Sequence, residues 1–177
     1  MKKSLKISVC LFVFFIILSF VTNNIEAQKL VFLYGHGLFA TPLDQSSKNR
    51  YNYGLGAEAG VGLGMKKTFF VGSIGYTSFN AKGNFVPFIG DHESYIPLKI
   101  GIRQYLPLKV IFLDGNLGLG FVNNKQDNST TRFAFDVGGG VKFAGFEAGI
   151  NWDNFREITP KGWSSWLAFK AGYRIGF

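Results

Sequence analysis

The sequence predicts an all-β protein, an eight-stranded antiparallel up-and-down transmembrane β-barrel that follows a cleaved signal peptide. Three observations lead to this fold class. Successive segments alternate bulky apolar residues with glycine and polar residues at the period of a β-strand. The connections between these segments alternate between short and long, as they do in barrels that cross a membrane. The chain also begins with the pattern of an export signal.

The amino-terminal residues have the pattern of a secretory signal peptide. Three lysines precede an apolar run over residues 7–21, and a polar stretch follows it. We expect cleavage after Ala27, so the chain divides into a signal peptide, 1–27, and one β-barrel domain, 28–177. An uncleaved anchor helix is the alternative, but the apolar run is short for a membrane span. We expect no lipid anchor at Cys10, which lacks the small-residue context of a lipoprotein cysteine.

The expected mature chain has 150 residues, a net charge of +6 and no cysteine, which excludes disulfide and thiol chemistry. Its basic residues are scattered and form no cluster in the sequence. Scattered charge in an exported chain fits the interior and rims of a barrel better than a phosphate-binding patch. We therefore expect no nucleic-acid partner.

The first four strands are expected over residues 29–40, 51–65, 68–79 and 95–106. The face that each residue of the first strand occupies is ambiguous. In the second strand, the bulky residues from Tyr51 to Met65 share one face, and the other face is almost entirely glycine and Glu58. The third strand points Ile74 outward and Ser73 inward, and the fourth sets four isoleucine and leucine residues against Lys99 and Arg103. The second, third and fourth strands therefore each have one apolar face.

The last four strands are expected over residues 109–121, 132–143, 146–153 and 163–177. Each sets an apolar face against a face of charged and small residues. The terminal strand is the clearest, because its last eleven residues alternate without interruption up to Phe177. Eleven residues are enough for a strand to cross a membrane.

Short connections are expected at 66–67, 107–108 and 144–145, and longer polar ones at 41–50, 80–94, 123–131 and 154–162. Their strict alternation is typical of tight periplasmic turns at one rim and external loops at the other. Within the second long loop, residues 85–89 form an apolar patch that could meet a partner or the membrane.

The bulky apolar face should point outward, toward lipid. Eight strands enclose a space only just wide enough to be filled by side chains, and phenylalanine and leucine from every strand would overfill it. Aromatic residues near the strand ends should form interfacial girdles. These residues are Tyr51, Tyr53, Tyr95, Trp152, Trp163, Trp166 and Tyr173.

The polar face then gives a lumen with six basic and five acidic residues. They are Glu58, Lys99, Arg103, Asp114, Arg132, Asp136, Lys142, Glu147, Asp153, Lys170 and Arg174. Charges in a narrow interior are costly unless they are paired, and this near balance would permit a closed network. The network either fills and rigidifies a plugged barrel or forms a narrow, gated conduit.

The terminal series Phe169, Ala171, Tyr173, Ile175 and Phe177, with residues 96–105 and 116–120, resembles the small eight-stranded outer-membrane barrels. These belong to the porin-like superfamily that includes outer-membrane proteins A and X. The resemblance implies an OmpA-like barrel in a Gram-negative outer membrane, with lipid and lipopolysaccharide around it. It also implies that the terminal series addresses the chain to the barrel-assembly machinery, with periplasmic chaperones as further partners. We expect a monomer without a following peptidoglycan-binding domain.

No enzyme is expected, although a lipid-modifying enzyme is a lesser alternative. Such enzymes need a constellation of the Ser–His type, and His36 has no serine nearby on its face. Asp91, His92 and Glu93 point apart in an extended segment, so neither a metal nor another cofactor is expected. The leading hypothesis is a non-catalytic barrel with a structural or surface-interaction role. A narrow porin-like channel is the alternative.

Overall fold

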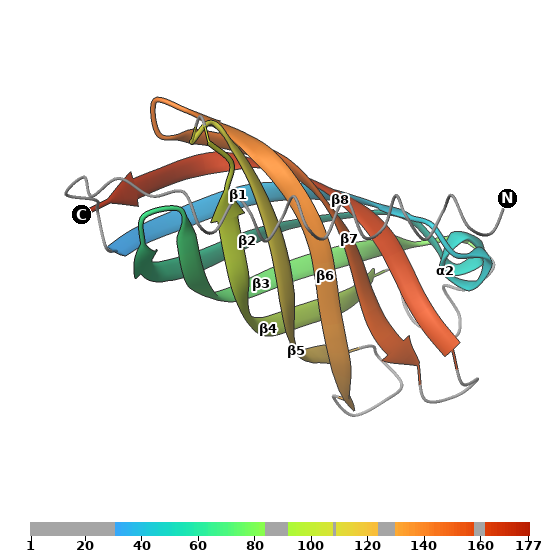
Figure 1. The fold of residues 1–177 in the computed structure, drawn as a ribbon. Coiled ribbons are helices and arrows are strands. Elements are labelled where there is room, and N and C mark those ends of the chain that lie inside the picture. Colours follow the sequence, from blue (N-terminus) through green and yellow to red (C-terminus); the bar gives the residue numbers. More distant parts are fainter. Residues whose placement is uncertain (1–30, 84–91, 108, 124–129, 158–161) are drawn as a thin grey trace, which may run out of the picture.

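Eight antiparallel strands form the body of the computed structural model, which describes residues 31–83, 92–107, 109–123, 130–157 and 162–177 (Figure 1). The predicted signal peptide and the apolar patch at 85–89 lie outside the described residues. The strands are β1 (Val31–Pro42), β2 (Tyr51–Met65), β3 (Thr68–Ala81), β4 (His92–Tyr105), β5 (Ile111–Asn123), β6 (Thr130–Phe143), β7 (Phe146–Glu157) and β8 (Gly162–Gly176).

The strands pair in sequence order and close into a barrel, because β1 also pairs with β8. This seam runs from Phe32 opposite Gly176 to Pro42 opposite Trp166. The barrel therefore has no free sheet edge, and the predicted fold class is confirmed. We call the end with the three short connections the turn end and the opposite end the loop end. The turns lie at the left of Figure 1, and the helix α2 (Gln45–Arg50) lies at the right.

The predicted strand positions are correct to within a few residues. The largest differences lie at the loop end, where β4 begins at His92 instead of 95 and β7 continues to Glu157 instead of 153. Polar residues extend the ladder there, since Asn80 pairs with His92 and Glu157 with Gly162. At the turn end, the second connection is longer than predicted, because β4 ends at Tyr105 and β5 begins at Ile111.

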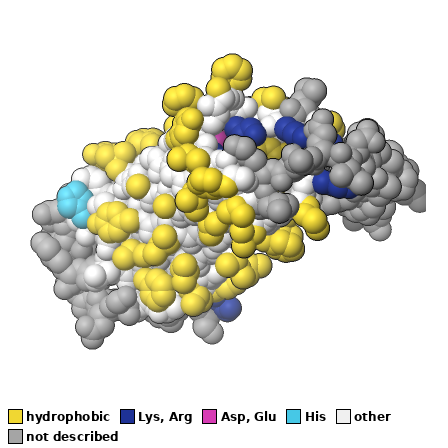
Figure 2. Space-filling model, turned by 90° about the vertical axis from the view of Figure 1, so that its left-hand side faces the viewer, with side chains coloured by type: hydrophobic (Ala, Val, Ile, Leu, Met, Phe, Trp, Pro, Cys, Tyr) yellow, Lys and Arg dark blue, Asp and Glu magenta, His cyan; other side chains and the backbone are white. Residues whose placement is uncertain are grey.

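The outer wall is covered with bulky apolar side chains. Yellow side chains are spread over the face that Figure 2 shows. Large apolar residues remain exposed on every strand, among them Phe70, Ile100 and Phe143. A water-soluble protein rarely exposes apolar surface on this scale, so this wall suits lipid.

The predicted aromatic girdle is only partly correct. Tyr53, Trp152, Trp163 and Tyr173 are exposed on the outer wall, whereas Tyr51, Tyr95 and Trp166 are buried inside the barrel. Tyr95 and Trp166 share the inward face with Lys99 and Lys170, so strand alternation overrides their position near a strand end. Tyr51 turns inward because the pairing of β2 with β3 shifts between Tyr51 and Gly54, as in a β-bulge.

The bulky faces point outward as predicted, but the lumen also holds large residues that the sequence analysis did not place there. The structure places two clusters of large, mostly aromatic residues inside the barrel, one near each end. Room for their rings comes from glycines on the inward faces of neighbouring strands. A Cβ atom at Gly62 would overlap the ring of Phe32, and one at Gly120 would overlap Tyr95. The glycine-rich faces therefore accommodate aromatic rings in a small barrel.

The first long connection contains the short helix α2, which the sequence analysis does not predict. Asp44 caps it, because its side chain accepts a hydrogen bond from the backbone N–H of Ser47. Lys48 and Arg50 lie in its last turn. Among the described residues, no helix is long and apolar enough to span a membrane.

The seam between β1 and β8 should be sensitive to a methyl group at Gly172. Its Cβ atom would overlap the carbonyl oxygen of Gly35, so the backbone would have to move. We expect Gly172→Ala to lower the free energy of unfolding by about 1–3 kcal/mol, measured by urea titration in lipid vesicles. Gly115→Ala is the control, because its Cβ atom would have no neighbour within 4 Å. Equal effects of the two substitutions would contradict this account of the seam.

Candidate functional site

The middle of the barrel is filled by a network of buried charges. Lys99 on β4 contacts two carboxylates from β6 and β7. Its ammonium group forms an ion pair with Asp136 and another with Asp153, 2.6 Å away. All three side chains are almost completely buried. Lys99 thus links β4 to β6 and β7, neither of which pairs with β4 in the sheet.

Arg103 lies four residues after Lys99 on β4, toward the turn end, and forms the second junction. Its guanidinium is 2.9 Å from Glu147 and 3.3 Å from Asp114. The same guanidinium lies 4.3 Å from the ring centroid of Phe112 and 4.9 Å from that of Tyr34. Arg103 therefore connects the charged centre to the aromatic cluster at the turn end.

The third junction joins β1, β2, β7 and β8. Lys170 is 2.9 Å from Glu58, and His36 lies between two carboxylates. Its Nε2 atom is 3.2 Å from Glu147, and its Nδ1 atom is 3.7 Å from Glu58. His36 thus bridges the Lys170 pair to the Arg103 pair.

Asparagine side chains complete the network. Asn151 donates hydrogen bonds of 2.8 Å to both Asp114 and Asp136, and Asn116 donates another to Asp136. Buried carboxylates need such donors as well as cations, since unsatisfied lone pairs in a low-dielectric interior are costly.

The structure brings eight of the eleven predicted lumen charges into direct ion pairs. They are Glu58, Lys99, Arg103, Asp114, Asp136, Glu147, Asp153 and Lys170. Arg174 joins them indirectly, because it donates to the hydroxyl of Tyr105, which donates to Glu147. Arg132 and Lys142 are half-buried toward the two ends, each 5.2 Å from the centroid of an aromatic ring.

The predicted balance of six basic and five acidic residues does not describe this connected group. It contains five carboxylates but only three lysine and arginine side chains. The difference arises because Arg132, Lys142 and Arg174 lie nearer the ends. His36 and the two asparagines, which the predicted balance did not include, supply further partners for the carboxylates.

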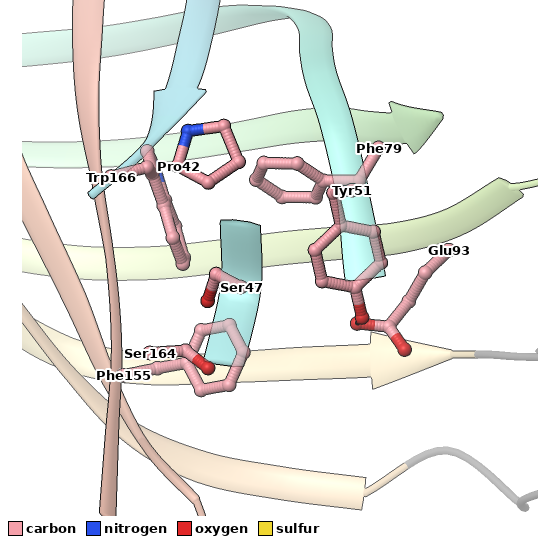
Figure 3. A pocket seen from close by; sticks show the side chains of 8 residues that line it. All are labelled: Pro42, Ser47, Tyr51, Phe79, Glu93, Phe155, Ser164 and Trp166. Carbon is pink, nitrogen blue, oxygen red and sulfur yellow. Dashed lines mark hydrogen bonds between the residues drawn. The ribbon is translucent and has the colours of Figure 1, made fainter. Parts of the chain in front are cut away.

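Aromatic clusters close the lumen above and below the charges. At the loop end, Tyr95, Phe155 and Trp166 pack against one another with ring centroids 5.1–5.4 Å apart. At the turn end, the cluster contains Phe32, Phe69, Tyr105 and Phe112. Inside the loop end a cavity of about 10 Å³ remains, roughly the space of one water molecule. Figure 3 shows that Ser47 of α2 points into it beside Ser164, Phe155 and Trp166.

Asp44 holds α2 over this end of the barrel. One carboxylate oxygen accepts from the N–H of Ser47 at 2.9 Å, and the other accepts from the N–H of Ser165 on β8 at 2.8 Å. Burial raises the pKa of the Asp44 carboxyl, but hydrogen bonds from Ser47 and Ser165 outweigh it and hold that pKa below its usual value. The ionised carboxylate thus fastens the helix to the barrel wall.

We expect Asp44→Ala to release α2 at a cost of about 1 kcal/mol. Hydrogen exchange of the Ser47 and Ser165 amides should accelerate, while exchange in the central strands stays unchanged. Because the folded pKa is depressed, this contribution is present above about pH 4 and is lost as the pH falls through the folded pKa. Gln45→Ala on the same helix is the control. Unchanged exchange in Asp44→Ala would show that the cap does not hold α2.

Sequence reasoning missed three parts of this site. His36 stayed outside the charge list because the faces of the first strand were ambiguous. Glu93 falls in the predicted long connection 80–94, but the structure places it at the start of β4, where it is buried and accepts a 2.7 Å hydrogen bond from Tyr51. The inward aromatics could have been found from strand alternation, since Tyr105 and Phe112 share a face with Arg103 and Asp114.

The structure offers no support for a metal centre in the described ranges. No group of three or more histidine, cysteine, aspartate or glutamate side chains there could hold an ion. His92 is exposed while Glu93 is buried, so the two side chains point apart. Asp91 lies outside the described residues.

Comparison with solved structures gives this arrangement a context. The chain is similar to the Yersinia pestis outer membrane protein Ail in a phospholipid bilayer nanodisc, with a TM-score of 0.57 and 17% identity, covering 82% of this chain and 99% of that one. The chain has the fold of the small outer-membrane β-barrels. No family model matches the sequence, and neither does any curated protein.

Two further small barrels share this fold. The N-terminal β-barrel domain of Pseudomonas aeruginosa OprF has a TM-score of 0.58 at 12% identity, covering 81% of this chain and 97% of that one. Neisserial surface protein A has a TM-score of 0.59 at 12% identity, covering 83% and 97%. Each compared chain is covered almost completely, so the described barrel corresponds to a whole barrel of this kind.

Proposed function

We propose that this protein is an integral barrel of the outer membrane with a non-catalytic, structural or surface-interaction role. Its interior is plugged, and its contacts with other molecules are made by the loop end and by the lipid-facing wall. The observation that supports this proposal best is the filling of the lumen. Aromatic clusters near both ends enclose a charged centre whose side chains are buried and paired.

The arrangement of His36 argues for a structural role over a catalytic one. The imidazole lies between Glu58 and Glu147, in the centre of a filled barrel. A hydrolase of the serine type needs the imidazole beside a hydroxyl nucleophile, where substrate can reach both.

Planar-bilayer recordings test the plugged interior. The purified full chain should insert without a large steady conductance, because buried charges and aromatic clusters fill the described part of the interior. A robust steady pore in the wild-type protein would instead support the narrow channel, the second candidate. The chain of ion pairs from Asp153 through Lys99 to Asp136 is the feature that favours this candidate, since such pairs can exchange partners.

A surface role is tested by exchanging the external loops. A barrel that carries foreign loops in place of the segments near 43–50 and 82–91 should still fold but lose binding to its surface partner. Unchanged binding would count against this role. Cell fractionation with a heat-modifiability gel tests the membrane location and the folded barrel independently of any partner.

We further propose that the outward face of β8 is the assembly signal read by the barrel-assembly machinery, after delivery by periplasmic chaperones. Phe169, Tyr173, Ile175 and Phe177 are exposed on this face, and Ala171 lies between them. Phe177→Ala should slow the appearance of the folded form in cells several-fold, while the purified variant folds normally in vesicles. Equal assembly rates in cells would contradict the proposal.

A further inference from the structure

His36 lies on β1, beside the seam at which the barrel closes. The strands β7, β8, β1 and β2 follow one another around the wall (Figure 1). One row of paired positions crosses them, and it contains Glu147, Gly172, His36 and Glu58 in that order. Because Gly172 has no side chain, the imidazole can reach over β8 to Glu147. A Cβ atom at Gly172 would lie 2.7 Å from the Cα atom of His36.

Two side-chain bridges cross the seam as a result. His36 on β1 contacts Glu147 on β7 at 3.2 Å, and this contact passes over β8. Lys170 on β8 contacts Glu58 on β2 at 2.9 Å, and this contact passes over β1. The main-chain pairing of β1 with β8 is therefore reinforced by one side-chain contact in each direction.

Both carboxylates beside His36 already accept hydrogen bonds from other groups. Glu147 accepts from the guanidinium of Arg103 at 2.9 Å and from the hydroxyl of Tyr105 at 3.1 Å. Glu58 accepts from the ammonium of Lys170 at 2.9 Å. Since these donors require both carboxylates to act as acceptors, neither carboxylate supplies a proton to the imidazole.

Each ring nitrogen of His36 faces one of these carboxylates. Nε2 is 3.2 Å from Glu147, and Nδ1 is 3.7 Å from Glu58 and has no hydrogen-bond partner. A neutral imidazole has one N–H, so its other nitrogen would turn a lone pair toward a carboxylate. The imidazolium has an N–H at both nitrogens. Because His36 is only 5% exposed, solvent screens this difference little, and the geometry favours the cation.

We propose that His36 is an imidazolium in the folded barrel at neutral pH and that its proton strengthens the seam. Loss of this proton leaves one carboxylate facing a lone pair and weakens the contact that passes over β8. Since the folded chain then binds more protons than the unfolded one, stability falls as the pH rises and the proton leaves. This inference adds a pH-sensitive closure to the barrel and does not depend on any surface partner.

The other charged groups around His36 should keep their charge in this pH range. Six titratable side chains contact His36 or its two carboxylates, namely Tyr34, Glu58, Arg103, Tyr105, Glu147 and Lys170. Nearer the turn end, Lys142 pairs in the sheet with Glu147, and Arg174 donates to Tyr105. Carboxyl groups ordinarily titrate near pH 4, and tyrosine, lysine and arginine titrate at about pH 10 or above. A change between about pH 6 and 9 therefore reports on His36.

The charge of His36 can be read directly, because the chain has two histidines. His92→Gln removes the other one, which is exposed at the start of β4. We expect nitrogen NMR of the histidine-labelled variant, folded in detergent micelles at about pH 7.5, to show protons on both ring nitrogens. The same chain unfolded in urea should show a mostly neutral ring at this pH.

Amide hydrogen exchange then tests the effect on the seam. The ratio of exchange rates in the β1–β8 pairing to those in the β4–β5 pairing removes the direct effect of pH on exchange. Between about pH 6 and 9 this ratio should rise at least about tenfold in the wild type, the size expected for a hydrogen bond to a charged group. In His36→Gln the ratio should be high throughout and constant. His92→Gln is the matched control and should follow the wild type.

A neutral imidazole in the folded barrel at about pH 7.5 would overturn the proposal. So would a wild-type ratio that stays constant over this range, or one that matches His36→Gln at every pH. A rise in exchange shared equally by all strand pairs would overturn the assignment to the seam. If His36→Gln does not fold, the NMR spectrum and the pH profile of His92→Gln provide the same decision.

Discussion

Lys99→Met should destabilise the barrel by about 3–5 kcal/mol, because it leaves two buried carboxylates without their shared cation. Asp136 and Asp153 both contact the Lys99 ammonium, and their strands pair directly at these positions. Without the cation, the buried carboxylates would repel each other with little screening by solvent. Methionine is an unbranched side chain only one atom shorter than lysine, so the loss measures charge more than volume.

Urea titration in vesicles, with unfolding monitored by tryptophan fluorescence, measures this loss of stability. Lys48→Met on the exposed face of α2 is the control and should change stability by less than about 0.5 kcal/mol. The charge-removing double variant Lys99→Met/Asp153→Asn should recover part of the stability. A Lys99→Met barrel as stable as the wild type would show that the network contributes little to the fold.

The strand pattern could be predicted because two independent regularities agreed. These are the alternation of apolar and polar side chains and the alternation of short and long connections. Side-chain alternation placed Lys99 and Arg103 on the face opposite Ile100 and Ile102, and the structure keeps that separation. The inward and outward faces of the first strand could not be assigned in this way, because both carry apolar residues. Phe32 and Tyr34 point inward while Leu33 and Phe39 point outward, so its sequence shows no contrast between the faces.

The remaining errors come from features that strand alternation does not contain. Tyr51 is turned inward by a local shift of pairing, and alternation assumes regular pairing throughout. The aromatic clusters depend on which glycine lies beside which ring, such as Gly62 beside Phe32, and that is decided by the register between strands. Some partners in the charge network, such as Lys99 with Asp136 and Asp153, come from strands that are not adjacent, so spacing along the chain does not reveal them.

The Glu58–Lys170 pair offers a test of the network in which both partners can be neutralised. Lys170→Met leaves the Glu58 carboxylate buried, with His36 at 3.7 Å as its remaining ion-pair partner, and should cost about 3–5 kcal/mol in a urea titration. Glu58→Gln/Lys170→Met removes both charges and should recover most of that loss, since a pair of neutral groups needs no compensating ion. A double variant as unstable as the single one would show that packing, not charge, is lost at Lys170.

The same variants separate stability from permeability. The aromatic clusters at the two ends, with Tyr95 and Trp166 in one and Phe32 and Tyr105 in the other, do not include the central pair and should remain in place when it is altered. Planar-bilayer recordings of Lys170→Met should therefore show no large steady conductance despite the lower stability. If the single variant conducts steadily while the double variant does not, the ion pair itself closes a path through the barrel, and the narrow channel becomes the better description.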